Sequence, residues 1–259
     1  MNDQKNTKDF RKKAFLVFWE CCRAFKKIVE TYLIRRYKVI TRIFRKIRRM
    51  FSGRQKAAVV FSSFKYWEWR YNNGGNSGAG SYGKLAQFKA NVLNDFVIKH
   101  GINSVVEYGC GDGAQLELAI YPEYTGFDVS PKAVTICREK FSGRPNFQFF
   151  ETKTLLDKEG SFDLAISLDV IYHLIEDAVF DGYMKRLFAS SRNFVIIYSN
   201  NVEKKFDVQH VRGRKFTQWC DEHAKGWTLF QVIENRYPYD PAQSNETSHS
   251  DFYVYKRVA

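Results

Sequence analysis

The chain has 259 residues, of which 44% are hydrophobic and 27% charged, as in globular proteins with one sizeable core. Five cysteines without a C-x-x-C pair and five scattered histidines indicate neither a disulfide framework nor a metal site. No stretch approaches the roughly 18 uncharged apolar residues of a membrane span, and no secretory cleavage signal is visible. We therefore expect a cytoplasmic protein with one domain of catalytic size.

The net charge of +13 comes from residues 1–56, which hold 18 of the 41 Lys and Arg residues but only 4 of the 28 Asp and Glu residues. Between Arg11 and Phe51, apolar residues recur at helical spacing, and basic residues fill the gaps. This pattern predicts a basic amphipathic helical extension over residues 1–56 that binds an anionic membrane surface peripherally. Docking on a protein partner or on the chain's own domain, and binding to nucleic acid, are the alternatives.

The predicted catalytic domain covers residues 57–259 and opens with an aromatic-rich segment, residues 62–83, that ends in Gly, Ser and Asn. This composition suits a flexible linker, but aromatic rings beside glycines also suit a lid over a bound ligand. We favour the lid. Residues 84–100 follow with apolar side chains at helical spacing, and Gly101 ends this predicted core-facing helix.

An apolar run, residues 104–108, then leads into three glycines at alternate positions, Gly109, Gly111 and Gly113. The pattern is typical of a buried strand that breaks into a tight turn and opens a short helix, here residues 114–118. Glycine permits positive φ angles and close approach of a cofactor, and N–H groups at a helix start face the same space. Asp128, 19 residues after Gly109, also fits the fingerprint of a dinucleotide site.

The remaining pattern alternates strands and helices, which predicts a doubly wound, mostly parallel α/β sheet. Ser130 and Pro131 suit the start of a helix that runs to Phe141. The other predicted elements are strands ending at residue 128 and over residues 146–150, 162–168, 193–199, 227–234 and 251–256, and a helix over residues 178–189.

Three segments, in their order and spacing, resemble the class I S-adenosylmethionine-dependent methyltransferases: the glycine turn preceded by Glu107, residues 124–130 and residues 161–174. The resemblance covers roughly residues 62–259 and implies a seven-stranded Rossmann-like sheet whose last two strands form a hairpin. Residues 62–83 also resemble the corresponding segment of small bacterial methyltransferases of polysaccharide pathways. S-adenosylmethionine is therefore the expected cofactor. A NAD-type oxidoreductase and an inactive cofactor-binding scaffold at a membrane are the alternatives.

Asp128, at the end of the second strand, is expected to hold both ribose hydroxyls, because a carboxylate accepts two hydrogen bonds. The resemblance places Glu107 near the methionine end of the cofactor and the N–H groups of the glycine turn against it. Where many family members have an aspartate for the adenine amino group, this chain has Glu151 and Thr152. The implied cofactor-binding residues are Glu107, Gly109, Cys110, Gly111, Gly113, Asp128, Val129, Glu151, Thr152 and Asp169.

Methyl transfer from a sulfonium needs alignment and, for a hydroxyl acceptor, a base. His173, just beyond the fourth strand, and His210 are the candidate catalytic bases. Arg212 and Arg214 alternate with His210 in sequence, which predicts an anion site if this segment is extended. Arg70 is the third residue assigned to the acceptor.

These features predict O-methylation of a sugar hydroxyl or phosphate on a glycan precursor or another phosphorylated small molecule. The basic extension, the arginine pair and the lid resemblance support this prediction, and they place the acceptor at the inner face of the cytoplasmic membrane. Nucleic acid is not expected as the acceptor, because residues 57–259 lack the excess positive charge that phosphate-backbone binding requires.

Overall fold

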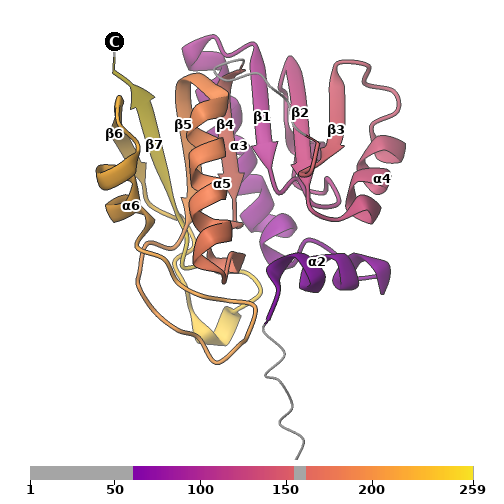
Figure 1. Cartoon of the computed structure of the whole chain (residues 1–259). Helices are drawn as coiled ribbons and strands as arrows, with labels where there is room; N and C mark the ends of the chain where they lie inside the picture. The colour runs from indigo at the N-terminus through magenta and orange to yellow at the C-terminus, as the bar shows by residue number, and fades with distance from the viewer. Residues whose placement is uncertain (1–60, 155–161, 259) are drawn as a thin grey trace, which may run out of the picture. The chain divides into compact units, whose positions relative to one another are not determined.

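A computed structural model describes residues 61–154 and 162–258 (Figure 1). The predicted basic extension over residues 1–56 lies outside the described residues. Within them, seven strands form one sheet in the order β3-β2-β1-β4-β5-β7-β6. The strands are β1 (Ser104–Tyr108), β2 (Glu123–Asp128), β3 (Phe147–Glu151), β4 (Phe162–Leu168), β5 (Ser191–Ser199), β6 (Trp227–Ile233) and β7 (Asp251–Arg257).

The first five strands pair in parallel, and β7 runs antiparallel between β5 and β6. The predicted sheet with a terminal hairpin is confirmed. The helices are α2 (Ser63–Asn72), α3 (Gly83–His100), α4 (Pro131–Lys140), α5 (Asp177–Ser190) and α6 (Phe216–His223). Short 3₁₀ turns are η1 (Ala79–Ser81), η2 (Leu116–Leu118), η3 (Ile171–His173) and η4 (Pro241–Gln243).

Helix boundaries follow the local signals in the sequence. The Ser130 side chain accepts from the Ala133 N–H, and Pro131 occupies the first turn of α4. Gly101 ends α3 in the left-handed region, with φ of 61°. The short helix predicted over residues 114–118 is confirmed only in part, because it is limited to the 3₁₀ turn η2. The backbone is already extended at Ala119, and so short a segment cannot sustain an α-helix.

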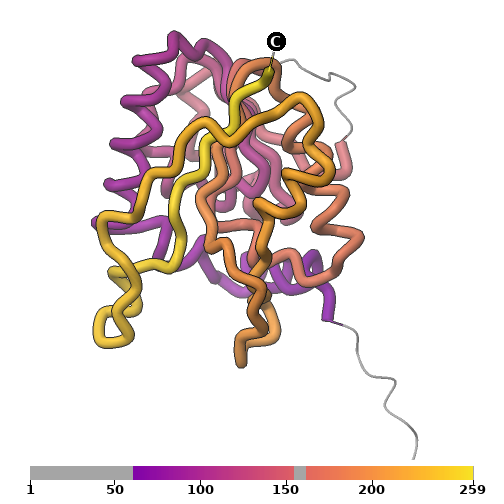
Figure 2. Tube along the Cα trace, turned by 90° about the vertical axis from the view of Figure 1, so that its left-hand side faces the viewer, coloured from indigo at the N-terminus to yellow at the C-terminus, as the bar shows by residue number. Residues whose placement is uncertain are grey.

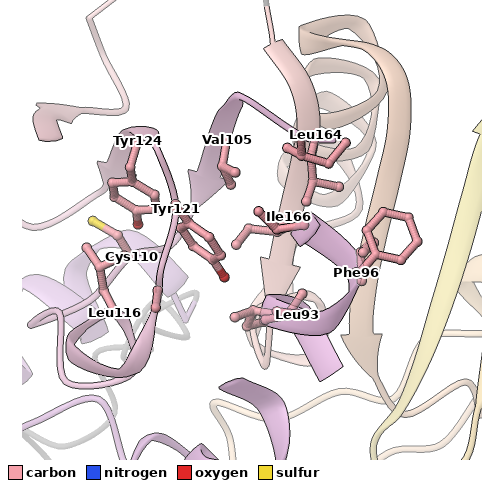
Figure 3. Packing of buried hydrophobic residues seen from close by; sticks show 14 of the residues in the cluster. Leu93, Phe96, Val105, Cys110, Leu116, Tyr121, Tyr124, Leu164 and Ile166 are labelled. Carbon is pink, nitrogen blue, oxygen red and sulfur yellow. The ribbon is translucent and has the colours of Figure 1, made fainter. Parts of the chain in front are cut away.

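The sheet is buried on both faces, which explains why its central strands show little apolar–polar alternation. Val105 points into the cluster that α3 and α4 cover, whereas its neighbour Val106 points into the cluster under α5 and α6. Figure 3 shows Leu93 and Phe96 of α3 packed with strand residues Val105, Leu164 and Ile166 in the first cluster. This packing fixes the strand ends that carry the polar residues.

The carboxyl ends of β1, β2 and β4 meet at one edge of the sheet. Helix α2, the segment after β5 (residues 200–215) and the β6–β7 connection (residues 234–250) lie at this same end of the molecule (Figures 1 and 2). Among the described residues, no helix is long and apolar enough to cross a membrane.

Candidate active site

A cavity of about 380 Å³ opens at the carboxyl ends of β1, β2 and β4, where open α/β sheets bind ligands. Residues 62–81 contribute part of its wall, including Trp67, Tyr71 and Ser77. The structure brings together in this lining most of the predicted cofactor residues and one predicted base: Glu107, Gly109, Cys110, Gly111, Asp128, Val129, Thr152, Asp169 and His173.

The three glycines of the turn all have positive φ angles, and each is required by a different neighbour. A Cβ on Gly109 would lie 2.5 Å from Val170 Cγ2, and a Cβ on Gly111 would lie 2.3 Å from Ser77 Oγ. A Cβ on Gly113 would lie 2.6 Å from the ring of Phe141, in the core. Gly113 is thus a packing glycine outside the cavity lining, and its predicted contact with the cofactor is not supported.

Gly109, Cys110 and Gly111 line the cavity, and their backbone amides donate to protein acceptors. The N–H groups of Gly109 and Cys110 both donate to the carbonyl of Phe127, at 2.7 and 3.0 Å. The N–H of Gly111 donates to Asp128 Oδ2 at 3.0 Å. The glycine turn therefore shapes the cavity, and the polar groups available to a ligand are those of the side chains around the turn.

Two buried carboxyl groups line the cavity. Asp128 accepts from the N–H of Gly111 and, at 2.8 Å, from that of Ser130. Burial raises the pKa of Asp128 to about 6, although these hydrogen bonds favour its ionised form. Glu107 accepts from the hydroxyl of Tyr124 at 2.6 Å, and burial raises its pKa to about 7. Both groups gain from a cationic or hydrogen-bond-donating ligand that offsets their lost hydration.

A buried ion pair that the sequence analysis missed joins Lys89 to Asp169 at 2.7 Å. The Lys89 side chain is only 1% exposed and also lines the cavity. Asp169 has φ of 59°, unusual for a non-glycine residue, and accepts from Tyr172 and Ser250 as well. A usable signal existed, because Lys89 lies on the apolar stripe of α3, where a lysine needs a partner.

The predicted lid segment is ordered and bonded to the glycine turn. Asp112 accepts from the Ser77 N–H at 3.0 Å, from Ser77 Oγ at 2.7 Å and from the Tyr82 hydroxyl at 3.0 Å. At its other end, the Ser63 N–H and Oγ both donate to the carboxylate of Glu176. Residues 62–83 thus form part of the cavity wall. Opening of this segment as a lid stays a prediction.

His173 lies in the cavity wall with a defined tautomer. Its Nδ1 is 2.8 Å from the backbone carbonyl of His210, so Nδ1 carries the proton and donates it. The ring packs edge-on against Trp67, at 4.8 Å between centroids. Burial lowers the pKa of His173 to about 4, which keeps the ring neutral at physiological pH. Within residues 61–154 and 162–258, Nε2 has no hydrogen-bond partner and is available as an acceptor.

His210 supports His173 through its backbone carbonyl, and its own ring is not in the cavity lining. That ring stacks on Tyr66 at 4.4 Å. Burial lowers the pKa of His210 as well. The two predicted bases therefore have different places in the structure. His173 lines the cavity, whereas His210 orients the His173 ring through its backbone carbonyl.

The predicted anion site at Arg212 and Arg214 is occupied by protein groups. Arg214 is buried, donates to the carbonyls of Leu174 and Ile175, and pairs with Asp177. Arg212 also pairs with Asp177, at 2.9 Å. The two side chains do point the same way, as predicted, but the acceptors they meet are Asp177 at the start of α5 and two carbonyls of the segment before it. Their assignment to the acceptor is not supported.

Two other predicted residues stand outside the cavity lining. Arg70 donates from Nε to the carbonyl of Asn76 at 2.7 Å and so braces the segment within residues 62–83. Glu151, at the end of β3, pairs with Lys153 at 2.6 Å. Of Glu151 and Thr152, only Thr152 lines the cavity.

The residues present fit S-adenosylmethionine. Asp128 supplies a carboxylate at the end of β2, where ribose hydroxyls are bound in nucleotide-binding sheets of this type. Glu107 and Asp169 supply carboxyl oxygens on the wall formed by β1 and β4, which can accept hydrogen bonds from the ammonium group at the methionine end. Among the described residues, no group of His, Cys, Asp and Glu side chains is arranged to hold a metal ion.

Residues 105–193 match the family model described as a methyltransferase domain. The N-methyltransferase NodS from Bradyrhizobium japonicum WM9, in complex with S-adenosyl-L-homocysteine, superposes with a TM-score of 0.60 at 13% identity, covering 76% of this chain and 99% of its own. Magnesium protoporphyrin IX methyltransferase from Synechocystis PCC 6803, with bound SAM, gives 0.56 at 14% identity, covering 78% and 100%. The methyltransferase domain of bacterial CtHen1 gives 0.54 at 19% identity, covering 68% and 100%. No curated protein sequence matches the chain.

The family match and the shared fold agree with each other. Residues 105–193 match a methyltransferase domain, and the described residues form the seven-stranded Rossmann-like sheet of the solved methyltransferases. The solved structures establish the fold alone at these identities, and they act on unlike acceptors according to their names. The acceptor of this chain has to be inferred from its own cavity.

Proposed function

We propose that this methyltransferase O-methylates a sugar hydroxyl on a glycan precursor. One observation carries the proposal: a neutral histidine of fixed tautomer, His173, lies in the wall of the cofactor cavity. A hydroxyl is a weak nucleophile, and a positioned base that removes its proton during transfer accelerates the reaction. When bound, the cofactor supplies a methyl group on a sulfonium that leaves as a neutral thioether.

The chain's own residues divide the remaining work. His173 Nε2 is the atom that would accept the hydroxyl proton, while the carbonyl of His210 keeps the ring in that tautomer. Trp67 holds the ring plane from the side and, together with residues 62–81, excludes water from the cavity. Alignment of the acceptor then provides most of the rate gain, since the two reactants are held in one geometry.

A hydroxyl is favoured over a phosphate as the methylated group. A phosphate acceptor calls for arginines or lysines at the cavity, but Arg212 and Arg214 are engaged at the start of α5. Lys89, a cation in the lining, is paired with Asp169. The cavity also contains Asp128, whose carboxylate repels an anionic acceptor. The phosphorylated part of a glycan precursor would therefore lie outside the cavity.

Membrane association through residues 1–56 remains part of the proposal. This segment carries 18 basic and 4 acidic residues, and each basic side chain near anionic lipid contributes about 1 kcal/mol. A lipid-linked glycan precursor is an acceptor that such a segment would bring within reach.

The test is methyl transfer from radiolabelled cofactor by the full-length protein to a panel of acceptors. The panel contains a lipid-linked sugar, its free sugar, a phosphorylated sugar without free hydroxyls at the reactive position, and RNA. We expect alkali-stable label in the sugar fractions and none in RNA. Label that appears only in RNA, or in no acceptor while the cofactor binds, would overturn the proposal.

A further inference from the structure

We propose that the rim of the active-site cavity is itself a membrane-contacting surface, which rests on an anionic lipid bilayer. The surface consists of helix α2 with its flanks (residues 61–83), residues 200–215 and residues 234–250, and we call it the rim surface. This inference rests on the proposed function, because it provides the route by which a lipid-linked acceptor reaches the cavity.

The rim surface exposes large apolar side chains that the fold does not use. Each of its three segments contributes at least one, and all are between 42% and 62% exposed: Phe64, Trp69, Val202, Val208 and Tyr239. Scattered exposed apolar residues are ordinary, but these come from segments that lie at one end of the molecule (Figures 1 and 2). Trp and Tyr are the residues that settle at membrane–water interfaces.

The position of the basic segment indicates what covers this surface. Residues 1–60 join the described domain at Phe61, and the next two residues, Ser62 and Ser63, line the cavity. Ser63 is held at the rim by its two hydrogen bonds to Glu176. The chain that carries the 18 basic residues therefore enters the described domain at the rim surface.

The charges divide the binding task between the two parts. The three rim segments together contain eight Lys and Arg and six Asp and Glu residues, so they provide little net attraction. Residues 1–56 supply the electrostatic attraction, and the rim supplies apolar contact. Stable peripheral attachment usually needs two such signals, since one alone binds reversibly and weakly.

The test uses the full-length protein and vesicles of phosphatidylcholine with or without phosphatidylglycerol. The rim variant is Trp69→Ser/Val208→Ser, because neither residue lines the cavity. The matched control is Ile98→Ser/Val232→Ser, which removes two exposed apolar side chains (68% and 45% exposed) from α3 and β6. Both variants retain the basic segment.

We expect the rim variant to bind phosphatidylglycerol vesicles about tenfold more weakly than wild type, and the control variant to bind within twofold of it. The rim contribution should persist in high salt, which screens the basic segment. In a second measurement, brominated lipid should quench the tryptophan fluorescence of the wild type, and Trp69→Phe should reduce this quenching. The proposed membrane contact of the rim surface would be overturned if both variants lost vesicle binding equally or if neither lost it. Absence of tryptophan quenching would also overturn it.

The outcome separates this inference from the proposed function. If no sugar acceptor is labelled but the rim variant loses vesicle binding, the proposed function fails and the membrane surface stands. If a sugar is labelled in solution but both variants bind vesicles like wild type, the membrane surface fails and the proposed function stands.

Discussion

The two polar clusters predicted from the sequence behave in opposite ways in the structure. Around the glycine turn, Asp128, Glu107 and His173 line a cavity, and each has an oxygen or nitrogen atom that can accept a hydrogen bond from a ligand. In the 210–214 segment, Arg212 and Arg214 donate hydrogen bonds to protein carbonyls and to Asp177. The comparison shows that residue type alone does not mark a site, because a polar group acts on a ligand only when the fold leaves it a free direction.

The largest expected effect concerns the two histidines. His173→Ala should lower kcat by a factor of about 10²–10⁴, because it removes the base, and the deficit should shrink at high pH, where the hydroxyl ionises unaided. His210→Ala keeps the backbone carbonyl that orients His173 and should retain most of the wild-type rate. Steady-state kinetics on the labelled acceptor decide the matter. Equal rate losses in the two variants would abolish the distinction between them.

A stability effect should separate the two arginines. Arg214→Ala should cost about 3 kcal/mol of unfolding free energy, since the carbonyl of Leu174 loses its buried donor and that of Ile175 keeps only Arg212. Arg212→Ala should cost less than about 1 kcal/mol, because its ion pair with Asp177 is largely solvated. Denaturant unfolding measures both changes. Neither variant should alter cofactor affinity; weaker acceptor binding by a stably folded Arg212→Ala would restore the anion-site hypothesis.

Glu107 should make the cofactor-free protein less stable as the pH rises. Its pKa is raised from 4.5 to about 7 in the folded state, so the folded form keeps a proton that the unfolded chain releases. The associated stability is present below about pH 4.5 and is lost as the pH rises through about 7. Since each pH unit corresponds to about 1.4 kcal/mol, Glu107→Gln should be about 3 kcal/mol more stable than wild type at pH 8 and equal to it at pH 4.

The exposed Glu123 at the start of β2 offers the control for that measurement. Glu123→Gln should unfold like wild type at both pH values. If Glu107→Gln is no more stable than wild type at pH 8, ionisation of the Glu107 carboxyl does not destabilise the folded protein. The inference that a cationic ligand would stabilise this buried group is then wrong.

A smaller effect is expected in the pH dependence of cofactor affinity. Burial raises the pKa of Asp128 to about 6, and protonation removes one of its acceptor sites for the ribose hydroxyls. Affinity should therefore fall as the pH drops below about 6, by at most about 1–3 kcal/mol. Titrations at pH 5.5 and 7.5 measure this change. Affinity that is constant between them, or greater at pH 5.5, would argue against Asp128 as the ribose contact.

Most of the fold could be predicted from the sequence because its signals are local. Apolar strands, the cap at Ser130 and the terminating Gly101 each act within a few residues. The exception was residues 114–118, where only the 3₁₀ turn η2 forms, because five residues are too few to sustain an α-helix. The terminal hairpin came from the resemblance rather than from any local pattern, and the strand order comes from the structure.

The site could be predicted only in part, because its long-range contacts leave weak traces in the sequence. The glycines were found, but the neighbours that require them, Val170 and Ser77, lie far away in sequence. The bond from His173 to a carbonyl 37 residues later has no sequence signal at all. Lys89 left a trace on the apolar stripe of α3, yet its partner Asp169 lies 80 residues away.

The central claim is that the cavity at the glycine turn binds S-adenosylmethionine through Asp128. Calorimetric titration of the full-length protein with S-adenosylmethionine and with its demethylated product tests it most directly, with Asp128→Ala and Arg212→Ala compared side by side. We predict that both ligands bind the wild type, that Asp128→Ala loses on the order of 1–3 kcal/mol of affinity through unpaired ribose hydroxyls, and that Arg212→Ala binds like wild type. Binding of a nicotinamide dinucleotide in place of both ligands, or unchanged affinity in Asp128→Ala, would contradict the account.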